Sequence, residues 1–192
     1  MPTVTLPHSG LAVPTPYPCV TDLRTLDLSC GQAFTAAVWF DGQEIGWLEN
    51  TGSGRATTFE PCEPDAVARR ARMEQFAALC SHPLLRLDRS LVYDLLVQEH
   101  DMAELVHTAV AAEGTVARFL VDGAPIGLFA DVAAAPTRWA DLAGDLDQLR
   151  ALEPGEDIVG HWQAWDGAAW RDLPSVPEAV EAESSGLILT AV

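Results

Sequence analysis

Two stretches of the chain alternate apolar and polar residues around an Asp-Gly pair, and both predict β-hairpins. They read VWFDGQEIGWLEN at residues 38–50 and RFLVDGAPIGLFAD at residues 118–131. Asp-Gly between apolar strands favours a type I′ turn, because both central residues of that turn need a positive φ. A third Asp-Gly pair, at Asp166 and Gly167, predicts another hairpin. We expect the apolar residues that follow the first two turns to be at least half-buried: Ile45, Trp47, Ile126 and Leu128.

The residues on either side of the first hairpin predict a strand and a helix. Leu26, Leu28 and Cys30 recur at a spacing of two, which predicts a strand with these side chains on one face. Further along, a stripe at helical spacing consists of Met73, Phe76, Ala77 and Cys80. The pair His82-Pro83 is expected to end that helix, because the residue before proline avoids the α region.

Two more helices are predicted downstream. The stretch DRSLVYDLLVQEHDMAELVHTAVAAEG forms the second, with Asp88 as its cap and Gly114 as its end. Its apolar face consists of Leu91, Leu95, Met102, Leu105, Val106 and Ala109. The stretch PTRWADLAGDLDQLRAL forms the third, and its apolar stripe consists of Trp139, Leu142, Leu146 and Leu149.

Three hairpins interspersed with three helices predict an α+β fold, with about three helices packed on one face of an antiparallel sheet. Five prolines occur in residues 1–20, so we expect an extended or disordered arm there. Residues 21–173 form one predicted domain. A division of this domain into two halves, 21–83 and 84–173, is also open. Residues 174–192 form a tail that is acidic and then apolar. The likeness of the first two hairpins leaves an internal duplication open.

The charge of the chain limits its ligands. Over 192 residues the net charge is −17, and all eleven basic residues are Arg. Direct binding to nucleic-acid backbones or to anionic lipid is not expected, since both need a basic surface. A basic protein partner, or mimicry of nucleic acid, fits the charge. An acidic exterior that serves only solubility fits it too.

The sequence predicts a protein of the cytoplasm. No run of 18 apolar residues occurs, and the first 20 residues lack the regions of a secretory signal. The four cysteines form no CxxC pair, and we expect buried free thiols. They are Cys19, Cys30, Cys62 and Cys80.

The stretch NTGSGR, residues 50–55, is rich in glycine, as phosphate-binding loops are. Such loops lead directly into a helix N-terminus, and a Walker loop also needs GK[ST]. Here ATTFEP follows, which is strand-like and ends in proline. A flexible hairpin connection is therefore the preferred interpretation.

His100, Glu104 and His107 project from one face of the second predicted helix. Two imidazoles and a carboxylate can bind a metal ion. This face lies opposite the apolar stripe, which predicts a solvated polar face unless another element covers it. A metal-dependent enzyme that uses these residues stays open as an alternative, although no cofactor is expected.

Cys80 and His82 place a thiol near an imidazole, as nucleophilic catalysis requires. Cys80 also belongs to the apolar stripe of its helix, so a core thiol is the preferred interpretation. No GxSxG, HExxH or kinase signature occurs in the chain. Catalysis is therefore the less favoured hypothesis.

Trp162, Trp165 and Trp170, with His161 beside them, surround the third Asp-Gly turn. Tryptophans around a tight turn can stack on a sugar, a base or a partner side chain. In strict alternation Trp162 and Trp165 face opposite sides, so at least one of them is expected in the core. Cross-strand packing and a partner-binding surface are both open, and the acidic surroundings argue against a nucleic-acid ligand.

The stretch AFTAAVWFDGQEIGWLENTGSG resembles a family of small uncharacterised proteins from phages and other mobile elements. The matching residues are Phe34, Asp41, Gly42, Asn50, Gly52 and Gly54. The resemblance covers residues 23–160, where FLVDGAPIG, APTRWADL and DIVGHW follow in the order of the family. The chain departs from the family at Arg55, in its proline-rich arm and in its tryptophan hairpin. The resemblance implies an accessory gene of a phage, prophage or plasmid, and it brings no known activity and no catalytic residues.

The hypothesis that the sequence favours is a small acidic non-enzymatic accessory protein that binds a host or defence protein. The first alternative is a DNA mimic that inhibits a restriction or other DNA-binding enzyme, so that the partner is a basic DNA-binding protein. Carboxylates spaced like duplex phosphates would favour mimicry, and an even distribution of charge would exclude it. Whether the chain forms homo-oligomers is open.

Overall fold

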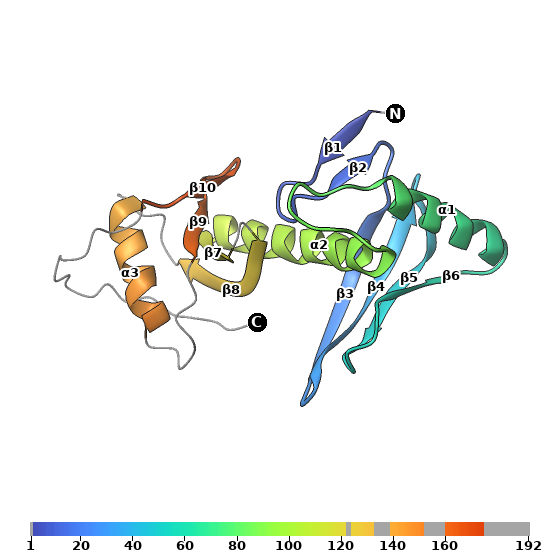
Figure 1. Ribbon diagram of the computed structural model, residues 1–192, viewed down its shortest axis with the longest axis horizontal. Coiled ribbons are helices and arrows are strands. Elements are labelled where there is room, and N and C mark those ends of the chain that lie inside the picture. The colour runs from blue at the N-terminus through green and yellow to red at the C-terminus, as the bar shows by residue number, and fades with distance from the viewer. Residues whose placement is uncertain (1, 122–123, 133–138, 152–159, 175–192) are drawn as a thin grey trace. The chain divides into compact units, whose positions relative to one another are not determined.

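The computed structural model contains two compact units, Met1–Ala103 and Glu104–Val192, and their boundary lies within one long helix. Each unit combines an antiparallel sheet with helices, which confirms the predicted α+β class (Figure 1). The hairpins build two four-stranded sheets, one in each unit, where the sequence predicted one sheet. The structure describes residues 2–121, 124–132, 139–151 and 160–174, without the side chains of 124–131, 140 and 147–151.

The first sheet is a meander whose strands are hydrogen-bonded in chain order. They are β3 (Cys19–Leu28), β4 (Gly31–Phe40), β5 (Gln43–Thr51) and β6 (Thr58–Pro61). Asp41 and Gly42 form the turn between β4 and β5 with φ of 52° and 75°, which confirms the type I′ prediction. Just past the turn, the register shifts between Val38 and Trp39, and Ile45 is the extra residue on β5.

The proline-rich N-terminal segment, where the sequence predicted an extended or disordered arm, contains a short hairpin and is part of unit 1. β1 (Thr3–Thr5) pairs with β2 (Ala12–Pro14) in antiparallel register. The connection between them is held by Glu99, whose Oε2 accepts hydrogen bonds from the backbone N of His8 at 2.9 Å and of Ser9 at 2.6 Å. Three apolar residues of the segment are buried in the core: Leu6, Leu11 and Val13.

Two helices contribute to the core of unit 1, α1 (Ala66–Leu79) and α2 (Arg89–Ala111). The predicted stripe of α1 is buried at Met73, Phe76 and Ala77. These side chains share one core with residues from a single face of the first sheet, called the inner face below: Val20, Ala36, Val38, Phe40, Ile45, Leu48 and Phe59. The opposite face of the sheet is called the outer face.

The predicted limits of α2 hold closely. Asp88 caps the helix, since its Oδ1 accepts a hydrogen bond from the backbone N of Leu91 at 2.9 Å. The helix ends at Ala111, and Glu113 rather than Gly114 takes the left-handed conformation, with φ of 61°. Of the predicted apolar face, Leu91 and Leu105 are half-buried, and the buried members are Leu95, Met102, Val106 and Ala109.

The second sheet, in unit 2, has the strand order β10-β9-β7-β8. The strands are β7 (Thr115–Val121), β8 (Ala124–Val132), β9 (His161–Trp165) and β10 (Trp170–Asp172). Helix α3 (Trp139–Ala151) packs on one face of this sheet. The core there contains Ala117, Phe119, Val132, Leu142, Ala143, Leu146, Trp162, Ala164 and Leu173.

The sequence predicted two Asp-Gly turns in unit 2, and the structure describes only the second of them. The Asp122-Gly123 turn and the C-terminal tail from residue 175 lie outside the described residues, and so do the side chains of Ile126, Leu128 and Leu149. The Asp166-Gly167 hairpin forms, but Trp165 pairs with Trp170, so its connection has four residues instead of two.

Candidate functional site

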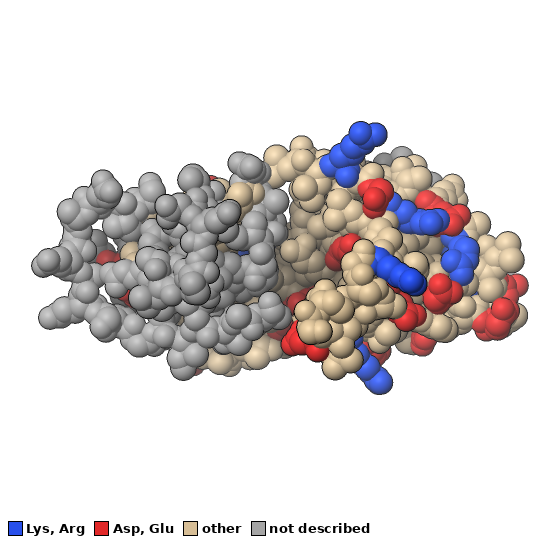
Figure 2. Space-filling view, turned by 60° about the horizontal axis from the view of Figure 1, so that its bottom comes forward, with Lys and Arg blue, Asp and Glu red and all other residues tan. Residues whose placement is uncertain are grey.

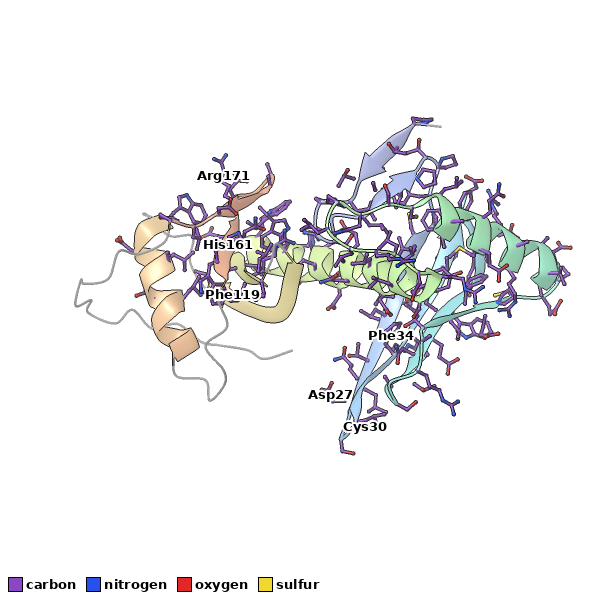
Figure 3. All side chains as sticks on the ribbon, viewed as in Figure 1. Asp27, Cys30, Phe34, Phe119, His161 and Arg171 are labelled. Atoms are coloured by element: carbon purple, nitrogen blue, oxygen red, sulfur yellow. The ribbon has the colours of Figure 1, made fainter. Side chains whose placement is uncertain are left out.

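The tryptophans of the third hairpin divide between the two faces of the second sheet, as strict alternation predicts. Trp162 is 4% exposed and lies edge-on to Phe119, with the ring centroids 5.2 Å apart. Both belong to the core beneath α3, which confirms that at least one tryptophan of the group is a core residue. Figure 3 labels Phe119 on β7 together with His161 on β9 and Arg171 on β10.

The other face of this sheet brings two tryptophans and an arginine together. Trp165 and Trp170 are half-buried and meet edge to face, with ring centroids 5.5 Å apart. The guanidinium carbon of Arg118 lies 4.1 Å from the centroid of the Trp170 ring. Arg118 also donates from Nε and Nη2 to Oε1 of Gln163, at 3.0 and 2.8 Å. A cation held against an indole face is stabilised by the ring quadrupole.

Polar side chains of β9 and β10 lie next to the two tryptophans and Arg118 on the same face of the sheet. The Oδ1 of Asp172 accepts a hydrogen bond from Nε2 of Gln163 at 2.7 Å and lies 3.1 Å from Nε2 of His161. His161 and Asp172 are exposed, whereas Arg118 is largely buried. We call the set the tryptophan face: Arg118, His161, Gln163, Trp165, Trp170 and Asp172. Its accessible part lies along β9 and β10, because Arg118 and Leu120, the β7 residues of the same face, are buried.

The loop of this hairpin is held by one carboxylate. Asp166 accepts hydrogen bonds from the backbone N of Ala168 and Ala169 at 2.9 and 2.8 Å, and it pairs with Arg171. The Arg171 guanidinium, followed by the two backbone N–H groups, lowers the pKa of Asp166 to about 2. The carboxylate is therefore ionised at neutral pH, and it positions the hairpin that carries Trp165 and Trp170.

The predicted metal residues lie along α2 without converging. His100 is half-buried, and Glu104 and His107 are exposed. Within the ranges that the structure describes, no three His, Cys, Asp or Glu residues form a group that could hold a metal ion. The metal hypothesis gains no support from these three positions.

The glycine-rich stretch NTGSGR connects β5 to β6, and α1 begins only at Ala66. Asn50 organises the connection: its Oδ1 accepts from the backbone N of Gly52 at 2.9 Å, and its Nδ2 donates to Thr57 Oγ1 at 2.9 Å. Gly52 and Gly54 have φ of 69° and 74°. These contacts agree with the hairpin interpretation and explain the Asn-x-Gly-x-Gly pattern as turn chemistry.

This connection is anchored to α2 through Thr57. The Thr57 hydroxyl donates to Oδ1 of Asp94, and the Thr57 backbone N donates to Oγ of Ser90 at 2.7 Å. Burial raises the pKa of Asp94; the hydrogen bond from Thr57 acts in the opposite direction, and Asp88 adds to the rise. The ionised carboxylate is thus disfavoured in the folded protein.

We expect Asp94→Ala to lower the free energy of unfolding by about 1–3 kcal/mol, because the buried Thr57 hydroxyl loses its acceptor. Asp94→Asn keeps an acceptor oxygen and should cost much less. Because the folded-state pKa of Asp94 is raised, its contribution to stability is largest below the ordinary pKa of 3.8 and declines as pH rises through the folded-state value. Urea unfolding of wild type and Asp94→Asn over acidic to neutral pH tests this. A wild-type stability that does not fall relative to Asp94→Asn contradicts the assignment.

Cys80 and His82 have structural partners in the fold. The Cys80 thiol donates to Phe76 O at 3.4 Å. The Nδ1 of His82 accepts from the backbone N of Leu84 and Leu85, both at 3.1 Å, so Nε2 carries the proton and donates to Ser9 O at 3.2 Å. The core-thiol interpretation of Cys80 agrees with these contacts.

All four cysteines are free thiols, as predicted, but the expected burial is wrong for Cys19 and Cys30, and Cys62 and Cys80 are only half-buried. Cys19 and Cys30 are exposed, because they belong to the β3 edge strand and to its tip. Figure 3 places Cys30 at the far end of the β3–β4 hairpin, near Asp27. The period of two could not show that Cys30 lies in the turn after β3, where its Sγ donates to Gly52 O at 3.3 Å.

We expect a thiol reagent to modify Cys19 and Cys30 quickly and Cys80 only after unfolding. Burial raises the pKa of Cys80 to about 12, which lowers its thiolate fraction about 1,000-fold relative to an ordinary thiol at the same pH. Mass spectrometry of peptides after timed labelling measures each site, and labelling in denaturant is the control. Equal labelling rates for Cys80 and Cys19 in the folded protein would contradict this.

The outer face of the first sheet carries exposed apolar side chains that the sequence did not predict. Trp47 was expected to be at least half-buried, but it is 39% exposed, while Ile45 two residues earlier is buried. The bulge at Ile45 turns that residue inward, and the pairing of Trp47 with Ala37 sets the indole on the outer face. Leu26 and Leu28 are also exposed there, at 62% and 40%.

A hollow of about 320 Å³ lies in unit 1 where β6 meets α1 and the first turn of α2. Its charged groups pair with one another: Arg70 with Glu60 at 3.2 Å, and Arg89 with Glu74 at 2.5 Å. Arg70 also donates to Phe59 O at 3.0 Å. These contacts satisfy part of the free edge of β6 and protect it from pairing with another strand.

No protein-family model, curated protein or solved structure matches the chain. The resemblance to accessory proteins of mobile elements therefore stays a prediction. No helix in the described part of the chain is long and apolar enough to cross a membrane.

Proposed function

We propose that this protein acts without catalysis, by binding another protein through the tryptophan face of unit 2. The observation that carries the proposal is the Trp165–Trp170 pair, half-buried and in contact edge to face, with Arg118 against Trp170. Tryptophan and arginine are enriched among the residues that dominate binding energy at protein interfaces. The hairpin holds the rings before a partner arrives, which lowers the entropy lost on binding.

The charge of unit 2 points to a basic partner. Residues 104–192 contain four arginines and fifteen acidic residues, a net −11, whereas residues 1–103 contain seven arginines and thirteen acidic residues, a net −6. Opposite charge steers association and suppresses unsuitable partners. A partner with an apolar centre and a basic rim fits this surface. The resemblance to mobile-element accessory proteins makes a host or defence protein the first to test.

Mimicry of DNA is the weaker candidate for unit 1, because the charges of this unit are mixed. Figure 2 shows arginine side chains among the acidic ones on the face in view. In unit 1, three arginines form ion pairs: Arg70 with Glu60, Arg72 with Asp41, and Arg89 with Glu74. A phosphate-like track needs carboxylates without cations between them.

Capture of partners from host lysate, washed at low and at high salt, tests the proposal. Apolar contacts of the tryptophan face should keep the partner bound at high salt, whereas contacts between exposed charges are screened. A partner that high salt releases completely favours mimicry over the tryptophan face. If no protein is retained under either wash, the binding proposal fails.

A further inference from the structure

The outer face of the first sheet is a second surface, separate from the tryptophan face. In unit 1 the buried residues of α1 and α2 share a core with the inner face alone. A sheet face in contact with water normally carries polar side chains at every second position. Here many of these positions are apolar: Cys19, Leu26, Leu28, Ala33, Ala37, Trp39 and Trp47. Leu26, Leu28 and Trp47 are exposed among them, and a partner that covers these side chains removes apolar surface from water.

Charged residues of opposite sign lie on different strands of this face. The register places Arg24 of β3, Thr35 of β4, Glu49 of β5 and Thr58 of β6 in one row across the sheet. Arg24 and Glu49 are two strands apart, about 10 Å. Two more carboxylates lie on this face: Glu60 of β6, which pairs with Arg70, and Glu44 of β5, opposite Trp39.

We infer that the outer face binds a second copy of this chain, sheet against sheet, about a two-fold axis that runs parallel to the strands. With the axis along β4, β3 of each copy lies over β5 of its partner. Arg24 of each copy then faces Glu49 of the other, and the two copies form two equivalent ion pairs around an apolar centre that includes Trp47. Such isologous contacts are the commonest form of homodimer.

Charge and size both favour this occupant. Two copies of a chain with a net charge of −17 repel one another, and approach is easiest through a face with charges of both signs. The three strands that overlap are nine or ten residues long and about 4.8 Å apart, which gives a flat area of about 450 Å². A stable interface buries about 800 Å² per partner, so side chains around these strands must contribute the rest.

Sedimentation velocity of the full chain over a range of concentrations tests this inference. We expect a dimer whose dissociation constant rises about tenfold or more in Arg24→Glu and in Glu49→Arg, because each change opposes like charges. The double variant R24E/E49R restores opposite charges and should recover most of the affinity. Trp47→Asp should weaken the dimer about thirtyfold or more.

Arg86→Glu is the matched control, since Arg86 is exposed on the connection between α1 and α2, away from the outer face. It should leave the dissociation constant unchanged, and thermal unfolding should show that all variants keep the fold. A wild-type chain that is monomeric at every concentration overturns the inference. A dimer that responds to Trp47→Asp but to neither charge reversal overturns the axis and its ion pairs. The proposed dimer does not involve the tryptophan face. A failure to capture a partner through that face would therefore not argue against the dimer.

Discussion

Trp162→Ala is expected to lower the free energy of unfolding of unit 2 by about 3–5 kcal/mol, because it removes a large buried ring and leaves a cavity. Trp162 is 4% exposed and packs against Phe119 in the core beneath α3. Its Nε1 is buried and has no hydrogen-bond partner among the described residues. Trp162→Phe removes that unsatisfied donor while it keeps an aromatic ring, so its cost should be about 1–2 kcal/mol.

Chemical denaturation followed by circular dichroism measures both variants, with Trp165→Ala as the matched comparison. Trp165 is half-buried on the opposite face, and the edge-to-face contact with Trp170 is worth about 0.5–1.5 kcal/mol. Trp165→Ala should therefore cost clearly less than Trp162→Ala. If the two alanine variants lose equal stability, the division into a core tryptophan and a surface pair is wrong.

Gly46→Ala should destabilise unit 1 by about 3–5 kcal/mol, through backbone strain and overpacking together. Gly46 has φ of 155°, and a Cβ there would lie 2.3 Å from the carbonyl O of Glu60 and 2.7 Å from the ring of Phe59. The glycine therefore lets β6 approach β5 beside the bulge at Ile45.

Gly42→Ala is the control for Gly46→Ala. Gly42 also has a positive φ, of 75°, but no atom lies within 4 Å of the added Cβ. It should cost about 1 kcal/mol, from the strained conformation alone. Thermal unfolding of the two variants separates backbone strain from crowding. Equal losses of stability would show that Gly46 is not required by the close approach of Glu60.

These two glycines explain the Asp-Gly-x-x-Ile-Gly stretch of the first hairpin. Gly42 serves the turn, and Gly46 serves the approach of the next strand. The second copy of the stretch, in unit 2, also has a register shift, between Arg118 and Leu120. The need for a turn and a bulge in both hairpins is enough to explain why the two stretches are alike. An internal duplication is therefore not required, and it stays open.

The sequence predicted elements well where a local rule determines them. The type I′ turn follows from positive φ at Asp41 and Gly42, and the start of α2 follows from the side chain of Asp88. The split of Trp162 from Trp165 follows from alternation along β9. Each of these features depends on residues that are neighbours in the chain.

What the sequence could not predict depends on long-range packing. Alternation assigns Leu26, Leu28 and Trp47 to faces, but it does not reveal which face the helices cover. The burial of the N-terminal segment depends on Glu99, about ninety residues away, which accepts from His8. The contact of Arg118 with Trp170 likewise depends on the pairing of β7 with β9.

Capture with the double variant W165A/W170A tests whether the protein binds a partner through the tryptophan face. Wild type, W165A/W170A and the control Trp47→Ala would be immobilised equally, after circular dichroism has shown that all three are folded. We expect Trp47→Ala to retain the salt-resistant partner of the wild type and W165A/W170A to lose it. Undiminished capture by W165A/W170A would contradict the claim.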